Sequence, residues 1–228
     1  MINKKKVLAI IPARGGSKGV RRKNIRVVAK KPLIAWSIEE AKKSKYIDRL
    51  VLSSEDNEII NIAQQWGCET QLRPEDLARD DTPGIEPVLN VIRELPGYDY
   101  TVLLQPTSPL RTVTDIDACI EYMIKNNSLS CVSVCQPSKS PFWSYRMEDN
   151  SKLIPLIDGK LISNRQQLPH IVALNGAVYV AETQWLVNNK SFLGEITIGY
   201  EMPQLRSLDI DSEMDLEICE YFLNKQAV

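Results

Sequence analysis

Short apolar runs alternate along the chain with longer segments in which apolar residues recur at helical spacing. The first run, at 6–13, is apolar at consecutive positions and precedes a glycine-rich stretch, as is typical of a strand buried on both faces. Further strands are predicted at 49–54, 68–72, 99–105, 129–135 and 175–182. Helices are predicted to begin near residues 32, 55, 84, 114 and 211. This alternation predicts an α/β fold with a mostly parallel sheet and helices on both faces.

Residues 136–175 depart from that alternation. They contain turns and short extended pieces but little helical spacing, and they are too long for an idle loop inside a compact domain. The pattern is compatible with a β-rich flap over a site or with an arm that packs on a second subunit. Because no internal repeat or low-complexity segment divides the chain, residues 1–228 are predicted to form a single domain that carries this insertion.

Charge is distributed unevenly. Residues 1–38 carry eleven Lys or Arg and no acid, whereas the remainder carries 17 basic and 29 acidic residues. The formal net charge of −1 argues against a general nucleic-acid binder. A local cationic site on an acidic body instead indicates a small anionic ligand.

The apolar runs are too short to span a membrane, and the N-terminus lacks the pattern of a signal peptide. We therefore expect a soluble cytoplasmic protein with no membrane partner. The five cysteines are odd in number and scattered through apolar segments, which predicts reduced core thiols rather than a disulfide framework.

The loop after the first predicted strand, ARGGSKGVRRKN at 13–24, has the composition of an anion site. Adjacent glycines let backbone N–H groups approach a ligand closely, and the flanking side chains supply charge and a hydroxyl. The side chains that could bind phosphate are Arg14, Ser17, Lys18 and Lys23. The spacing matches neither the Walker pattern nor the dinucleotide fingerprint. Phosphate binding and a solvated basic loop both remain open on spacing alone.

Three further segments follow predicted strands. LRPEDLARDD at 72–81 contains Arg73, and LLQPTSPLR at 103–111 presents Gln105 and Thr107 on a proline-rigid turn. LDIDSEMDL places Asp209 and Asp211 two residues apart, a hard-oxygen pair that suits Mg²⁺ when phosphates complete its coordination. Helix capping or a solvated acidic turn is an equal alternative for that pair taken by itself. A basic phosphate loop opposite it favours the metal site.

Together with RQQLP and NGAVYV, these segments resemble the CMP-sialic acid synthetase (N-acylneuraminate cytidylyltransferase) family, in the same order and over nearly the whole chain. The resemblance implies a Rossmann-like nucleotidyltransferase fold with an extended dimerisation arm at 136–175. It also implies that the anomeric hydroxyl of a nine-carbon 2-keto sugar acid attacks the α-phosphorus of CTP and releases pyrophosphate. The implied partners are CTP, the sugar acid and a second copy of the chain, with Mg²⁺ as cofactor.

The resemblance also assigns residues. On the nucleotide side, Arg14, Ser17, Lys18 and Lys23 would hold the triphosphate, Asn24 the ribose, and Arg73 with the backbone at Ala13 the cytosine. On the sugar side the implied residues are Gln105, Thr107, Arg165 and Tyr179. Asp209 and Asp211 would be the Mg²⁺ ligands, and the catalytic residues would be Arg14, Lys18, Lys23 and Asp211. No general base is assigned.

Two positions depart from the sialic acid pattern. Trp143 stands where a lysine is expected, and Ala173 stands where an arginine is expected. A less cationic pocket suggests legionaminate or pseudaminate as the sugar, unless the arm aligns differently and Lys139 or Arg146 supplies the charge. An eight-carbon acid, as in CMP-Kdo synthesis, is a less favoured alternative. A nucleotide-binding module without catalysis is disfavoured by the intact aspartate pair.

Overall fold

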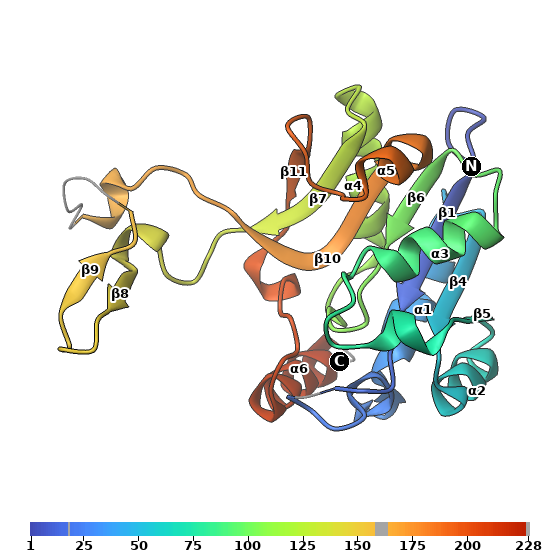
Figure 1. Ribbon diagram of the computed structural model, residues 1–228, viewed down its shortest axis with the longest axis horizontal. Helices are drawn as coiled ribbons and strands as arrows, with labels where there is room; N and C mark the ends of the chain where they lie inside the picture. Colours follow the sequence, from blue (N-terminus) through green and yellow to red (C-terminus); the bar gives the residue numbers. More distant parts are fainter. Residues whose placement is uncertain (18, 158–163, 227–228) are drawn as a thin grey trace.

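Seven strands form one sheet in the computed structural model, which describes residues 1–17, 19–157 and 164–226 (Figure 1). The strand order is β11-β7-β10-β6-β1-β4-β5. The bounds are β1 (Val7–Pro12), β4 (Arg49–Ser54), β5 (Glu69–Leu72), β6 (Tyr100–Leu103), β7 (Ser130–Cys135), β10 (Ala173–Glu182) and β11 (Ile198–Glu201). β1 pairs in parallel with β4 and β6, β4 with β5, and β7 with β11. The predicted mostly parallel sheet is confirmed.

Helices cover both faces of this sheet, as the sequence predicts. On one face α1 (Leu33–Lys42), α2 (Asn57–Gln65) and α4 (Val113–Lys125) pack on the odd-numbered side chains of β1. On the other face α3 (Glu86–Glu94) and α5 (Thr183–Asn189) pack on its even-numbered side chains. α6 (Glu213–Gln226) packs on the start of α1 and on the short hairpin of β2 (Val27–Val28) and β3 (Lys31–Pro32). β1 is buried on both faces. Its carboxyl end lies beside those of β4 and β6, because the three strands are parallel.

β10 is the strand that runs against its neighbours. It pairs antiparallel with both β6 and β7, so its first residues lie at the edge where β6 and β7 end. Its register against β7 shifts between Leu174 and Tyr179, and Gly176 within this irregularity has a φ of +72°. The chain therefore makes a tight excursion at the edge of the sheet where ligands of open α/β proteins bind.

The segment between β7 and β10 forms an arm that extends away from the sheet, at the left of Figure 1. It carries the two-stranded hairpin of β8 (Tyr145–Met147) and β9 (Leu153–Pro155) and three-residue helical turns η3 (Pro141–Trp143) and η4 (Arg165–Gln167). The segment extends away from the sheet, and its packing on a second subunit stays a prediction.

Several elements were not expected from the sequence, among them β2, β3, α5 and β11. α5 and β11 lie in a stretch whose apolar residues are too sparse to show either period, and β11 is half exposed at the edge of the sheet. The cysteine prediction is confirmed: all five are free, and all but the half-buried Cys135 are buried. Among the described residues, no helix is long and apolar enough to cross a membrane.

A buried carboxylate fixes the connection between β11 and α6. Asp115, in the first turn of α4, is fully buried and accepts hydrogen bonds from Nε and Nη2 of Arg206 at 2.8 and 2.9 Å. Its Oδ2 also accepts from the N–H and hydroxyl of Thr112. Arg206 stands three residues before Asp209, so this ion pair anchors the segment that carries the two aspartates.

We expect Arg206→Met to lower the free energy of unfolding by about 2–3 kcal/mol, because it leaves the buried Asp115 without its charged partner. Urea denaturation measures the change. The control is Arg49→Met, which removes a bidentate but exposed pair with Glu69 and should cost under about 1 kcal/mol. Equal losses in the two variants would contradict the anchoring role.

Candidate functional site

The carboxyl ends of β1 and β6 open onto a cavity of about 480 Å³. Its walls come from the loop after β1, the segment after β5, the turn after β6 and the connection before α6. Of the residues predicted from the sequence, those that line it are Arg14, Ser17, Lys23, Asn24, Arg73, Gln105, Thr107 and Asp211. Segments far apart in the chain thus meet at the edge of the sheet that the fold predicts.

Carboxylates of neighbouring loops accept hydrogen bonds from the basic loop. Nη1 of Arg14 is 2.7 Å from Oδ1 of Asp80, and the Gly15 N–H donates to Oε1 of Glu55 at 2.6 Å. Carboxylate oxygens resemble phosphate oxygens in charge and hydrogen-bond geometry. The loop is therefore held with its donors directed at anionic groups.

Glu55 also holds the arginine that follows β5. Nε and Nη2 of Arg73 donate to Oε2 of Glu55 at 3.1 and 2.8 Å, and the Arg73 side chain is buried. Asn24 supports the loop from the opposite side, because its Nδ2 donates to the carbonyl oxygen of Arg14. Arg73 and Asn24 thus contact the cavity while fixing the backbone of the basic loop.

Lys23 joins the basic loop to the aspartate segment. Its Nζ donates to the carbonyl oxygen of Ile210 at 2.6 Å and lies 3.3 Å from Oδ1 of Asp211. Gly19 makes this approach possible, because a Cβ at that position would lie 2.2 Å from the carbonyl oxygen of Asp211. A cation and an acid predicted at opposite ends of the chain are therefore in contact.

Asp209 lies beside the turn after β6. The N–H of Ile210, the next residue, donates to the Thr107 carbonyl at 2.9 Å. Burial, and to a lesser extent the nearby Asp211, raises the pKa of Asp209 above its ordinary value. The two aspartates are close enough to influence each other, although Asp209 lines a neighbouring hollow and Asp211 lines the main cavity.

The aspartate pair fits a shared magnesium site and not a closed protein cage. Among the described residues, no three His, Cys, Asp or Glu side chains gather as a metal-binding group. Mg²⁺ is commonly bound by one or two carboxylates together with substrate phosphates, and it keeps several waters. Asp211 contacts Lys23 of the basic loop and Asp209 lies near Asp211, so the pair meets that requirement.

The predicted sugar side centres on Gln105. Its Oε1 accepts a weak hydrogen bond from Thr107 at 3.4 Å, and a Cβ on Gly176 would lie 3.2 Å from the same oxygen. Gln105 therefore rests against the backbone at Gly176. The ring of Tyr179 packs on Phe192 with centroids 5.6 Å apart, and burial raises the pKa of its hydroxyl. Tyr179 thus lies beside the cavity and does not line it.

Three other predicted residues are Ala13, Arg165 and Lys18. Ala13 is fully buried and its N–H donates to Ser53, so only its backbone could reach a ligand. Arg165 begins η4 in the arm, away from the sheet (Figure 1). Lys18 lies outside the described residues. The roles of all the predicted site residues stay predictions.

Of the two departures from the sialic acid pattern, Trp143 lies in the arm and Ala173 lies where the arm rejoins the sheet. Trp143 lines a hollow of about 270 Å³ together with Lys139, Pro169 and His170. Ala173 is exposed and pairs with Cys135 where the arm leaves and rejoins the sheet. Lys139 lies in the same hollow as Trp143, so a cation is present there.

Several residues of the site were missed from the sequence. Arg79, Asp80 and Thr82 line the cavity. Glu55 accepts hydrogen bonds from the Gly15 N–H and from Arg73. Arg79 and Asp80 lie within LRPEDLARDD, so they could have been predicted from the same motif as Arg73. Glu55 follows a predicted strand directly, but nothing local distinguishes it from a helix-terminal acid.

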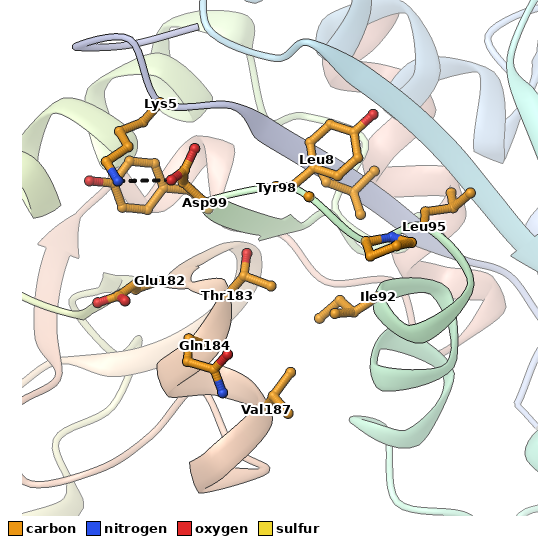
Figure 2. A pocket seen from close by; sticks show the side chains of 13 residues that line it. Lys5, Leu8, Ile92, Leu95, Tyr98, Asp99, Glu182, Thr183, Gln184 and Val187 are labelled. Atoms are coloured by element: carbon orange, nitrogen blue, oxygen red, sulfur yellow. Dashed lines mark hydrogen bonds and ion pairs between the residues drawn. The ribbon is translucent and has the colours of Figure 1, made fainter.

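A second cavity, of about 500 Å³, lies at the amino ends of β1 and β6 and is shown in Figure 2. Its cation, Lys5, is paired with Asp99 at 2.8 Å, and its floor is formed by apolar side chains including Leu8, Ile92 and Val187. It lacks the convergence of several cations that an anionic ligand needs, so the cavity at the carboxyl ends is the candidate site.

A mostly parallel sheet with a basic loop after its first strand and an aspartate pair across from that loop defines a nucleotidyltransferase fold. Comparison with solved structures agrees. CMP:2-keto-3-deoxy-manno-octonic acid synthetase complexed with CTP matches with a TM-score of 0.74, at 16% identity over 97% of this chain and 99% of that one. The 4-diphosphocytidyl-2C-methyl-D-erythritol synthase of Anaerococcus prevotii matches with a TM-score of 0.69, at 11% identity over 96% and 99%.

The chain belongs to the cytidylyltransferase family, whose model matches residues 8–217. It is 34% identical to the N-acylneuraminate cytidylyltransferase of Escherichia coli O18:K1:H7, over 93% of this chain but only 51% of that protein, so it spans about half of that relative. It is also 34% identical to the CMP-N,N'-diacetyllegionaminic acid synthase of Legionella pneumophila, over 98% of this chain and 99% of that protein. A pseudaminic acid cytidylyltransferase of Campylobacter jejuni is 32% identical, over 94% and 95%.

We expect Gly19→Ala to lower the melting temperature by roughly 3–8 °C, because the added methyl must push the Asp211 backbone away from Lys23. Differential scanning calorimetry measures it. Gly16→Ala is the matched control in the same loop, since a Cβ there meets nothing within 4 Å. A melting temperature unchanged in both variants would contradict the close approach.

Proposed function

We propose that this chain transfers the cytidylyl group of CTP to a nine-carbon 2-keto sugar acid. The oxygen of the anomeric hydroxyl forms a bond to the α-phosphorus, the bond from that phosphorus to the β-phosphate oxygen breaks, and the hydroxyl proton is lost. The products are the CMP-sugar acid and pyrophosphate. The observation that carries the proposal is the contact between Lys23 and Asp211 at one wall of the cavity, in a member of the cytidylyltransferase family.

The ion pairs of the site support an exchange on CTP binding. Arg14 would pass from Asp80 to the triphosphate, and Lys23 would pass from Asp211 to the phosphates. Asp211 is then available, with Asp209, to hold Mg²⁺, which when bound neutralises charge on the phosphates. Ser17 and Lys18 belong to the same loop and would contact the triphosphate. The donors are already arranged around carboxylates, so little reorganisation of the loop is needed.

The sugar acid would lie between Gln105, Thr107 and Gly176, at the side of the cavity nearest the arm. Trp143 and Ala173 stand where two cations are expected, and Lys139 supplies one beside Trp143, so a net loss of positive charge favours a deoxy diacetamido acid such as legionaminate or pseudaminate over N-acetylneuraminate. The full-length similarity to the Legionella and Campylobacter proteins agrees with this choice. A cytoplasmic location stays a prediction, in line with CTP as a substrate.

The arm supports a homodimer in which one copy completes the sugar side of the other. Its hairpin has strands of three residues each, and an isolated hairpin is marginally stable in water. Large apolar side chains along it are exposed, Met147 and Leu156 among them at 70% and 66%. A second copy of the chain would cover this face and place Arg165 near the partner's cavity.

The activity is tested by pyrophosphate release with CTP, Mg²⁺ and a panel of acids: N-acetylneuraminate, legionaminate, pseudaminate and Kdo. We expect turnover with at least one nine-carbon acid. Release with none of them would overturn the proposal, and release with Kdo alone would reassign the substrate to an eight-carbon acid.

Asp211→Asn should lower kcat by about 100-fold or more, because it removes a metal-binding carboxylate while keeping the side-chain volume. Steady-state kinetics on the folded variant measure the loss. Glu213→Gln is the control, since Glu213 is an exposed acid of the same segment that pairs with Arg26. Activity of Asp211→Asn within threefold of the control would refute the assigned role.

Light scattering coupled to size exclusion should give twice the 25.8 kDa of one chain for the unmodified protein. Leu156→Asp should shift the mass toward one chain, because it places a charge on the apolar face of the arm. Leu193→Asp, at a similarly exposed position on the body, should leave the mass unchanged. A monomeric parent protein would contradict the arm-mediated dimer.

A further inference from the structure

The last residue of LLQPTSPLR is a cation buried among neutral groups. Arg111 is 1% exposed. Its Nη1 donates to the carbonyl oxygens of Gln105 at 3.1 Å and Ala177 at 2.7 Å, and its Nη2 donates to Oγ of Ser37 at 2.6 Å. Its Nε has no hydrogen-bond partner within the described parts of the chain. The guanidinium therefore makes all of its described hydrogen bonds to uncharged oxygens.

This arrangement is unfavourable for stability alone. Burial lowers the pKa of Arg111 to about 10, and the attraction of Glu40 and Asp115 offsets only part of that effect. The oxygens of those two acids are already engaged, by Lys43 and the Val113 N–H in one case and by Arg206 in the other. A well-packed apolar side chain would avoid the cost of burying the charge. The position of the cation needs another explanation.

The two carbonyls that Arg111 holds belong to the two walls of the predicted sugar side. Gln105 follows β6 and begins the Pro-Thr turn, whereas Ala177 directly follows Gly176 in β10. One Nη1 atom bridges them, and the Ser37 hydroxyl also donates to the Gln105 carbonyl, at 3.3 Å. The side-chain amide of Gln105 meets Gly176 across the same gap. The guanidinium thus fixes the separation of both walls.

We infer that Arg111 is a positioning residue for the sugar acid: by bridging the Gln105 and Ala177 carbonyls it sets the width of the sugar side and leaves the nucleotide side unaffected. The inference rests on the proposed function. The described hydrogen bonds of Arg111 reach none of the residues of the basic loop, whose own supports are Glu55, Asn24 and Asp80. Its loss therefore acts on one substrate and not on the other.

The test compares the KM for the sugar acid with the KM for CTP in Arg111→Lys and Arg111→Met. Both variants should raise the KM for the sugar acid, by about tenfold or more in Arg111→Met, because the two walls lose their common donor. The smaller effect is expected for lysine, which keeps the charge but not the planar fork. The KM for CTP, and the Kd for CTP measured by calorimetry without sugar, should stay within twofold.

Thr101→Ala is the control for a loss of stability. Thr101 is fully buried and bonds Thr183 at the opposite end of β6, so its loss should lower the melting temperature without separating the two KM values. If Arg111→Met does not fold, Arg111→Lys decides. A sugar KM within twofold of the parent in folded Arg111→Lys, or equal weakening of both substrates, would overturn the role of Arg111. An unmodified protein that turns over no acid would overturn the proposed function itself, and the role of Arg111 with it.

Discussion

The site depends on one contact between the two ends of the chain, the interaction of Lys23 with the Ile210–Asp211 segment. Lys23 comes from the loop after β1, and Asp211 comes from the segment just before α6. Gly19 is the residue whose lack of a side chain allows the two backbones to meet. The anchor of Arg206 on Asp115 and the bond from Ile210 to Thr107 hold the acidic segment on its other side. Because these supports converge, a charged pair is held beside an open cavity in a defined position.

The internal carboxylates of the cavity also explain how a loop with so many cations stays ordered. Like charges in a short loop repel, and each needs a counter-charge or solvent. Asp80 supplies a counter-charge to Arg14, and Asp56 with Glu58 does so for Arg22, while Glu55 accepts a hydrogen bond from the Gly15 N–H and pairs with Arg73 after β5. Arg22 is therefore a clamp on the start of α2. An anionic ligand entering the cavity competes with groups of its own chemistry, which favours exchange over rearrangement.

The sequence predicted most of the fold because the buried strands and the helices each show a clear period. β1 is apolar at every position, which only a strand covered on both faces requires. α5 and β11 were not predicted, because edge and surface elements need few apolar residues. The candidate site was predictable where chemistry is concentrated in short motifs, as with Lys23 and Asp211. Glu55 and Arg111 were not assigned, since their partners are backbone groups and side chains that only the fold brings near.

The reversed direction of β10 brings the two ends of the arm together on one strand pair. The arm leaves the sheet at Cys135 and returns at Ala173, two residues that already face each other across a strand pair. An excursion that starts and ends at paired positions can be lengthened, shortened or exchanged without disturbing any other strand pairing. The loop after β1 is held differently, because its residues form hydrogen bonds with Glu55, which follows β4, and with the Ile210–Asp211 segment before α6. A change in the length of the arm would therefore leave the walls of the cavity at the carboxyl ends of β1 and β6 in place.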